Sequence, residues 1–140
     1  MRTFEGSCHC GALSFVYQTA LPPDRWSIRA CQCGFCRAHA ALTTSDPSGR
    51  LTFHAGRNAR LRRYRFALMT AEFLLCSCCG VYVGAQIQTA HGCFGIINTR
   101  TLRPLPAELP PGAVADYGSE GAPERVARRE GKWTPLEKLI

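Results

Sequence analysis

Cysteine is the residue that most constrains how this chain can fold, because nine of its 140 residues are cysteines and most of them are clustered. An odd number of cysteines cannot pair completely within one chain, so disulfides alone do not explain the pattern. Three clusters hold seven of them: Cys8 and Cys10 as C-x-C, Cys31, Cys33 and Cys36 as C-x-C-x-x-C, and Cys76 and Cys79 as C-x-x-C before Gly80. Of the other two, we expect Cys78 to stay outside any metal site and Cys93 to be a small core residue.

The beginning of the sequence indicates the compartment in which these thiols work. Residues 1–10, MRTFEGSCHC, lack the apolar run of a secretory signal peptide. The sequence also has no run of about 18 apolar residues that would span a membrane. We therefore expect a cytoplasmic protein with no membrane partner. Because the cytosol is reducing, thiols there are better candidates for metal binding or catalysis than for disulfides.

The spacing within each cluster suits zinc. Zinc favours thiolates because it is borderline-soft, and its filled d shell imposes no geometry of its own. In a C-x-x-C-G sequence a tight turn points both sulfurs inward, and Gly80 permits the left-handed backbone that often closes such a turn. In C-x-C on an extended segment, residues two apart project from the same face. Three such clusters in one short chain predict metal binding.

Seven ligands divide naturally into four and three. A structural zinc takes four protein ligands, whereas a catalytic zinc keeps one position open and commonly has three. Spacing alone leaves open which pairs meet: two pairs can close one site and leave the triple at 31, 33 and 36 open, or the triple can borrow one more cysteine. We expect two Zn²⁺ per chain. Seven thiolates (−7) and two Zn²⁺ (+4) lower the formal charge from +7 to +4, which still attracts anions.

Length and patterning predict a single β-rich domain spanning residues 1–140. The 46% hydrophobic fraction excludes a disordered chain, and thirteen glycines and nine prolines imply many turns. The Pro- and Gly-rich segment 104–123 is expected to be a surface loop, and the charged C-terminal segment 124–140 to hold one or two helical turns around 124–129. Extended segments are expected at 11–18, 26–30, 51–54, 61–66, 72–75, 81–88 and 95–102.

Several stretches of the sequence together resemble one known family. Gly6-Ser-Cys-His-Cys-Gly11, Cys31-Gln-Cys-Gly-Phe-Cys-Arg37 and Cys76-Ser-Cys-Cys-Gly80 follow the cysteine order of the glutathione-dependent formaldehyde-activating enzyme family, also called the CENP-V/GFA domain. Ile97-Asn-Thr-Arg-Thr-Leu102 and Lys132-Trp-Thr-Pro135 are similar to later segments of that family. The resemblance covers most of the chain.

The resemblance implies a mostly β, Mss4-like fold of small antiparallel sheets around zinc sites. It also implies the division of ligands: Cys8, Cys10, Cys76 and Cys79 for a structural zinc, and Cys31, Cys33 and Cys36 for a catalytic zinc. The family's named reaction joins formaldehyde to the thiol of glutathione, and the reverse is a carbon–sulfur lyase step. We therefore expect a zinc-dependent aldehyde–thiol adduct enzyme or carbon–sulfur lyase, with a small thiol such as glutathione and an aldehyde as substrates. Because three thiolates make the ion a weak Lewis acid, we expect it to hold the substrate sulfur.

The catalytic cluster departs from the family at two positions. Many members read Cys-His-Cys-Ser, whereas Gln32 and Gly34 occupy the His and Ser positions here. Gln32 can donate and accept hydrogen bonds but cannot titrate, so a proton-transfer partner is missing. His39 is a candidate acid–base group because it follows Cys36 by three residues. Phe35, within the cluster, is a candidate wall of the substrate pocket.

A dense run of arginines gives the main alternative function. It is interpreted as a solvated strand face, as a clamp for glutathione carboxylates or as a contact for nucleic-acid phosphates. Few aromatic residues interleave with it, so nucleic acid is the less favoured partner. The alternative is a non-catalytic zinc-binding module that contacts nucleic acid or protein through this basic face; the sequence indicates no oligomeric state. The run consists of Arg57, Arg60, Arg62, Arg63 and Arg65.

Overall fold

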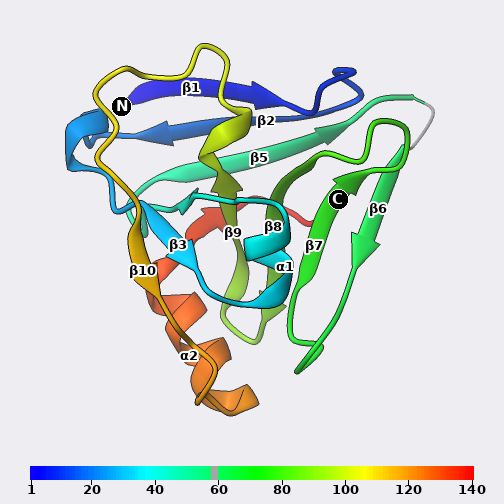
Figure 1. Ribbon diagram of the computed structural model, residues 1–140, viewed down its shortest axis with the longest axis vertical. Helices are drawn as coiled ribbons and strands as arrows, with labels where there is room; N and C mark the ends of the chain where they lie inside the picture. The colour runs from blue at the N-terminus through cyan, green and yellow to red at the C-terminus, as the bar shows by residue number, and fades with distance from the viewer. Residues whose placement is uncertain (58–59) are drawn as a thin grey trace.

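The strands form one connected mixed sheet that bends around the core (Figure 1). The computed structural model describes residues 1–57 and 60–140. Its strands are β1 (Arg2–Ser7), β2 (Leu13–Thr19), β3 (Arg29–Cys31), β4 (Thr43–Thr44), β5 (Arg50–Ala55), β6 (Leu61–Tyr64), β7 (Glu72–Cys76), β8 (Tyr82–Thr89), β9 (Gly92–Asn98), β10 (Ala113–Ala115) and β11 (Thr134–Leu136). Its helices are α1 (Gly34–Ala38), α2 (Ala122–Lys132) and the 3₁₀ turns Pro23–Arg25 and Thr99–Thr101.

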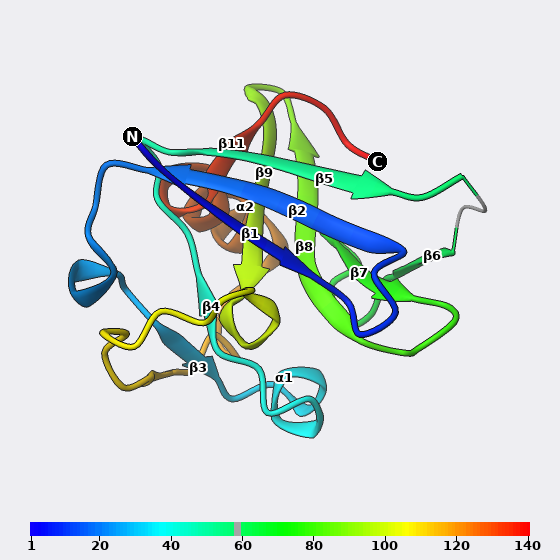
Figure 2. The ribbon, with the colours of Figure 1, turned by 90° about the horizontal axis from the view of Figure 1, so that it is seen from above.

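The first group of strands is an antiparallel layer of β1, β2 and β5. Seen from above, these strands cross over β8 and β9 (Figure 2). Leu13, Phe15 and Tyr17 of β2 are buried and alternate with half-buried residues, as the sequence pattern at 11–18 predicts. Because one face of this layer carries large apolar side chains, it packs onto the second group of strands.

The second group is the antiparallel run β6–β7–β8–β9, and β9 connects it to the rest of the sheet. Along one edge β9 pairs with β8, and along the other it pairs with β11 and β4. Two pairings are parallel, β11 with β5 and β10 with β3. The mostly β class is thus confirmed, and the small sheets expected from the sequence are joined at their edges into one.

Two clusters of buried side chains fill the space inside the sheet. One lies beneath β2 and β5 and includes the buried Cys8 and Cys76. The other contains Phe73, Tyr82 and Trp133 and includes the buried Cys36. Each group of clustered cysteines therefore borders a water-excluding core, which is where a metal–thiolate site is protected from exchange.

The helices differ most from the sequence-based expectations. The C-terminal helix α2 has 11 residues, longer than expected, and begins where the Glu124 carboxylate accepts a hydrogen bond from the Gly121 N–H (3.4 Å). The short α1 within the cysteine triple and the strand β10 within the loop 104–123 were not expected. Within the part of the chain that the structure describes, no helix combines the length and apolar composition of a membrane span.

A glycine in β8 shows how closely the two groups of strands approach. A Cβ at Gly84 would lie 2.8 Å from Cζ of Phe53 in β5, and it would also clash with the Ile96 carbonyl oxygen of the neighbouring strand β9. We expect Gly84→Ala to lower the free energy of unfolding by about 1–3 kcal/mol, measured by urea denaturation, because the strands must move apart. The control is Gly131→Ala in α2, where a Cβ meets nothing within 4 Å and alanine favours the helix. Equal stability of both variants would contradict this packing argument.

Candidate metal centres and the adjoining cavity

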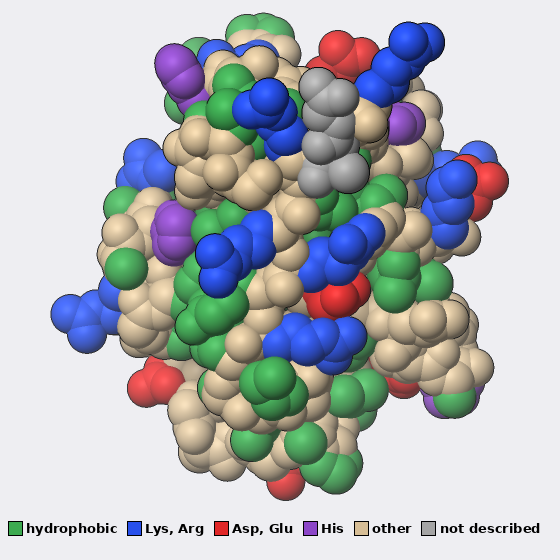
Figure 3. Space-filling model, turned by 90° about the vertical axis from the view of Figure 1, so that its right-hand side faces the viewer, with side chains coloured by type: hydrophobic (Ala, Val, Ile, Leu, Met, Phe, Trp, Pro, Cys, Tyr) green, Lys and Arg blue, Asp and Glu red, His purple; other side chains and the backbone are tan. Residues whose placement is uncertain are grey.

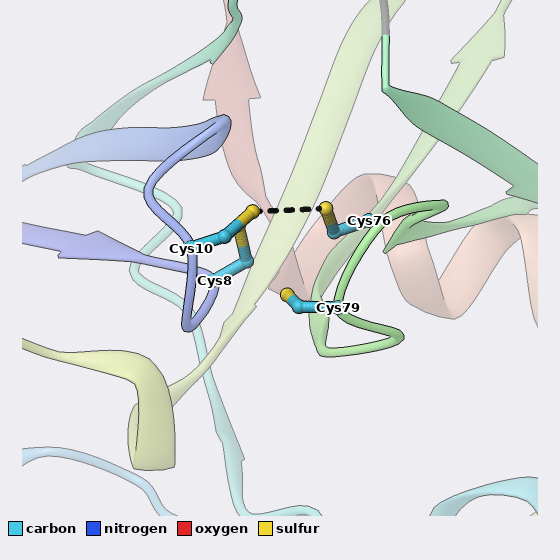
Figure 4. A group of neighbouring side chains, drawn as sticks. All are labelled: Cys8, Cys10, Cys76 and Cys79. Atoms are coloured by element: carbon cyan, nitrogen blue, oxygen red, sulfur yellow. Dashed lines mark hydrogen bonds between the residues drawn. The ribbon is translucent and has the colours of Figure 1, made fainter.

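Four cysteines from two distant turns meet in one closed cluster. Cys8 and Cys10 come from the β1–β2 connection, and Cys76 and Cys79 from the β7–β8 connection (Figure 4). The Sγ atoms of Cys8 and Cys10 lie 3.7 Å apart, and those of Cys10 and Cys76 lie 3.5 Å apart. All four sulfurs are within 4.8 Å of one another. The structure therefore brings the C-x-C pair and the C-x-x-C pair together and leaves the cysteine triple separate.

Both turns of this closed cluster are shaped by backbone hydrogen bonds and a left-handed glycine. Cys8 donates from its N–H to the Leu13 carbonyl (2.8 Å), and the Leu13 N–H donates to Cys8 Sγ (3.3 Å). In the second turn the Gly80 N–H donates to the Cys76 carbonyl (2.8 Å). Gly11 and Gly80 adopt φ of 83° and 78°, which side-chain-bearing residues rarely adopt. These local interactions aim the sulfurs inward.

The separation of the four sulfurs fits a tetrahedral zinc. Zinc–thiolate bonds of about 2.3 Å in a tetrahedron place the sulfurs about 3.8 Å apart, close to the observed separations of 3.7 and 3.5 Å. Burial raises the pKa of Cys79, but hydrogen bonds from the backbone of Cys10 and Val81 and from neighbouring thiols lower it to about 6. The pKa of Cys10 shifts the other way: the backbone hydrogen bond of Ala12 lowers it, but hydrogen bonding to the Cys76 thiol and burial outweigh this effect and raise the pKa to about 12. The donor set and its spacing suit a thiolate-bound metal ion.

The other three clustered cysteines form a separate group between β3 and α1. Cys31 ends β3, and Cys33 is the N-cap of α1, where its Sγ accepts a hydrogen bond from the Cys36 N–H (3.4 Å). The three Sγ atoms lie within 4.8 Å of one another. With three sulfurs in place and the group bordering a cavity, a metal ion held here has room for a fourth ligand.

The thiols of this triple influence one another strongly. A hydrogen bond from Cys36 outweighs burial and lowers the pKa of Cys31 to about 5. The same hydrogen bond, together with burial, raises the pKa of Cys36 far above its ordinary value. Sulfurs this close all ionise only where a cation offsets their repulsion. The triple is therefore chemically suited to a metal ion as well as geometrically.

A cavity of about 450 Å³ adjoins the cysteine triple. One part of its wall is apolar and includes Phe66, Phe73, Ile96 and Trp133. Another part is basic, with Arg29 from β3 and three arginines from α2. The volume and mixed lining are those of a small-molecule site, and the cysteine triple stands at its edge. The α2 arginines are Arg125, Arg128 and Arg129.

Glu120 pairs with two of these four arginines. Its carboxylate accepts hydrogen bonds from Arg128 (2.8 and 3.0 Å) and from Arg125 (3.4 Å). The hydrogen bond from Arg128, against the effect of burial, holds the pKa of Glu120 below its ordinary value. The Arg128 guanidinium also lies 3.5 Å from the centre of the Tyr117 ring. These contacts fasten the segment before α2 to the helix and shape one side of the cavity.

The arginine run predicted as a candidate clamp lies elsewhere. Arg62 and Arg63 are exposed on β6, and Arg65 pairs with Glu72 at 3.6 Å. Figure 3 shows this side of the molecule, with Lys and Arg side chains scattered among apolar ones. None of Arg57, Arg60, Arg62, Arg63 and Arg65 is among the residues that line the cavity. The observed position agrees with the interpretation of a solvated strand face.

The other candidate residues of the triple are also placed away from the cavity. Phe35 packs against Phe66, Phe73 and Tyr82, with ring centroids 4.9–5.1 Å apart, and supports the wall from behind. His39 lies against Phe35 at 4.5 Å, so it does not reach the cavity as a group facing a substrate. Outside the metal clusters, Cys78 is exposed and Cys93 is half-buried against the core.

The two positions that depart from the family pattern face different surroundings. Gln32 lines the cavity, and its side-chain amide donates to the Ala30 carbonyl (2.9 Å). A Cβ at Gly34 would meet nothing within 4 Å, so packing does not explain the missing side chain.

Sequence reasoning missed the arginines of α2 as site residues. A signal was present, since positions 125, 128 and 129 follow the i, i+3, i+4 spacing that places side chains on one face of a helix. What the spacing does not reveal is that this face turns toward the cysteine triple, roughly ninety residues earlier in the chain.

Comparisons with known proteins agree with the fold and the cysteine clusters described above. The sequence model of the family described as "Glutathione-dependent formaldehyde-activating enzyme" matches residues 3–117. A crystal structure of a Rhodobacter sphaeroides protein is similar to this chain, with 26% sequence identity and a TM-score of 0.52, over 80% of this chain and 98% of that one. No curated protein matches the chain. The Mss4-like class, a mostly β fold around cysteine clusters, is thereby confirmed; the family match ends before α2.

Proposed function

Because the chain belongs to the glutathione-dependent formaldehyde-activating enzyme family, we propose that it is a zinc-dependent enzyme that makes or breaks a carbon–sulfur bond between a thiol and an aldehyde. Glutathione and formaldehyde are the first substrates to test. The observation that carries the proposal is the three-sulfur group at the edge of a cavity, which leaves a metal ion room for a substrate ligand.

The two groups of cysteines take different roles in this proposal. Four sulfurs at tetrahedral separations support a closed structural zinc at Cys8, Cys10, Cys76 and Cys79. The triple at Cys31, Cys33 and Cys36 supports a catalytic zinc. None of the nine cysteines, all of which lie in the described part of the chain, forms a disulfide, which fits a reducing compartment and favours the cytoplasm as the location.

The cavity supplies the conditions for the reaction. Zinc on the triple would hold the substrate sulfur as a thiolate. In the joining direction the thiol sulfur bonds to the carbonyl carbon, the carbonyl electron pair moves to oxygen, and the proton lost by the thiol is replaced by one on that oxygen; the reverse returns thiol and aldehyde. Phe66, Phe73 and Trp133 limit the access of water to the reacting groups. Gln32, held by the Ala30 carbonyl, offers a non-titrating hydrogen-bonding group beside the triple.

The proposal predicts faster exchange between free and adduct forms of the substrates. With glutathione and formaldehyde, NMR exchange spectroscopy should show adduct formation above the uncatalysed rate, falling to that rate when a chelator removes zinc and recovering when zinc is returned. The lining does not by itself identify the thiol, so other thiols form a second series. Unaccelerated exchange together with salt-sensitive DNA binding would favour the non-catalytic module and its exposed arginines instead.

A further inference from the structure

We infer that Arg29 and Arg129 form a carboxylate-binding subsite in the cavity, so that the thiol substrate carries a carboxylate that reaches these two guanidinium groups. The inference deepens the proposed function and rests on it for the identity of the substrate as a thiol. Its basis is that two arginines line the cavity without an acidic partner among residues 1–57 and 60–140.

Arg129 has the clearest unmet bonding capacity in the cavity wall. Its side chain is buried, with 7% of the residue exposed, and its Nε has no hydrogen-bond partner within the described part of the chain. One terminal nitrogen donates to the Thr70 hydroxyl (2.7 Å), and the guanidinium lies 4.8 Å from the centre of the Trp133 ring. Burial, with repulsion from Arg128 and Arg125, lowers the pKa of Arg129 to about 10, so it stays charged at neutral pH. A buried charge without an anion is costly, which favours binding of an anionic ligand.

Arg29 presents a second guanidinium from β3. It donates to the Ser45 hydroxyl (2.6 Å), and Ser45 in turn donates to the carbonyl of Lys132, the last residue of α2. This chain of hydrogen bonds fixes the Arg29 side chain relative to the helix that carries Arg129. Arg29 is half-buried, so its charge is partly removed from water.

The charges of the cavity wall favour an anionic ligand, and the shape of the guanidinium groups favours a planar one. Four arginines and two acids line the cavity, and one of those acids, Glu120, already binds Arg125 and Arg128. The other acid, Asp116, is exposed and accepts a hydrogen bond from the Gly118 N–H (2.9 Å). Arg29 and Arg129 are therefore the arginines left to meet a ligand. Guanidinium groups match carboxylates in a bidentate manner, and small thiols of metabolism that bear carboxylates include glutathione itself.

The subsite combines one arginine inside and one arginine outside the part of the chain that the family model matches, because α2 lies beyond that part. The family match covers residues 3–117 and so includes the cysteine triple and Arg29, whereas Arg129 lies beyond it. The sulfur-binding end of the cavity and the proposed carboxylate-binding end thus come from different parts of the chain. Substrate choice is set where α2 closes the cavity.

The subsite can be tested with probes that have no free thiol. We would measure the affinity of the full-length protein for S-methylglutathione and for its dimethyl ester by isothermal titration calorimetry. The wild type is expected to bind the free acid about 10- to 100-fold more tightly, because charge-assisted hydrogen bonds are lost in the ester. Arg129→Met should bring this ratio close to one and leave the melting temperature equal or higher, since a buried unpaired charge is removed. A merely structural arginine would lower the melting temperature and leave the ratio unchanged.

Two further variants serve as controls for the role of Arg129. Arg50→Met removes the same charge from an exposed position on β5 outside the cavity and should keep the full ratio. If Arg129→Met does not fold, the same binding ratio of acid to ester is measured on Arg29→Met. Equal binding of acid and ester by the wild type, or an unchanged ratio in the folded variants, overturns the inference. If the protein discriminates between acid and ester but does not accelerate adduct exchange, the proposed function is rejected and the subsite is retained. If it accelerates adduct exchange without discriminating between acid and ester, the proposed function is retained and the subsite is rejected.

Discussion

Cys76→Ser should leave the chain unfolded and without its structural zinc. Cys76 is buried, and its sulfur lies 3.5 Å from that of Cys10, which comes from the other end of the sheet. Structural zinc contributes about 10–16 kcal/mol in small zinc-dependent folds, whereas a domain is stable by about 5–15 kcal/mol in total. A serine oxygen is a poor replacement for a thiolate, so most of this contribution disappears. We expect loss of the cooperative thermal transition by circular dichroism and loss of the bound metal by elemental analysis.

The same turn offers a matched control for this prediction. Cys78 is exposed and lies in the sequence between Cys76 and Cys79, but it does not belong to the closed cluster. Cys78→Ser removes one thiol from the same turn and should retain both zinc ions and the wild-type melting temperature. A Cys76→Ser protein that melts cooperatively near the wild-type temperature would show that no metal holds these two turns together.

Cys33→Ser should reduce the zinc content from two ions per chain to one and reduce adduct formation to the uncatalysed rate. The fold should survive, because the triple is separate from the closed cluster. Serine suits this position structurally: Cys33 is the N-cap of α1, and a serine hydroxyl accepts the hydrogen bond from the Cys36 N–H at least as well as a sulfur does. The substitution therefore separates loss of the metal from loss of the helix.

Metal content, melting and activity must be measured together on this variant. Cys78→Ser again serves as the control for removal of a thiol. One zinc, a cooperative transition and no activity would support an independent catalytic ion. Two zincs with full activity would contradict a metal at the triple, and an unfolded variant would show that the triple, like the closed cluster, holds the fold.

The strands were the part of the fold most accessible from sequence. The alternation of Leu13, Phe15 and Tyr17 predicted β2 because side chains on a strand alternate between faces, whatever the strand pairs with. The length of α2 was underestimated because its charged sequence shows few apolar residues; the helix buries Arg129 rather than an aliphatic stripe. The five-residue α1 is too short to leave a periodic signal, and its start depends on the Cys33 cap.

The candidate site was accessible in its chemistry and not in its surroundings. Phe35 lies within the triple and His39 follows it closely in sequence, yet α1 turns both toward the aromatic cluster behind the cavity wall. The densest arginine run lies on the edge strand β6 and in the segments that flank it, while the sparser arginines of α2 line the cavity. Proximity in sequence predicts which residues share a turn, but it does not predict which surface faces a cavity.

The sequence by itself determined which residues of this protein are candidate metal ligands, because C-x-C, C-x-x-C and the glycines after them act through turns only a few residues long. Spacing alone left open which pairs meet; the tertiary structure decided this, and it decided which residues line the cavity. Cys10 and Cys76 are 66 positions apart, and their sulfurs come within 3.5 Å because the sheet, which runs from β7 through β8, β9, β11 and β5 to β2 and β1, brings the β1–β2 turn beside the β7–β8 turn. Such contacts depend on the register of the whole sheet, which no local pattern encodes.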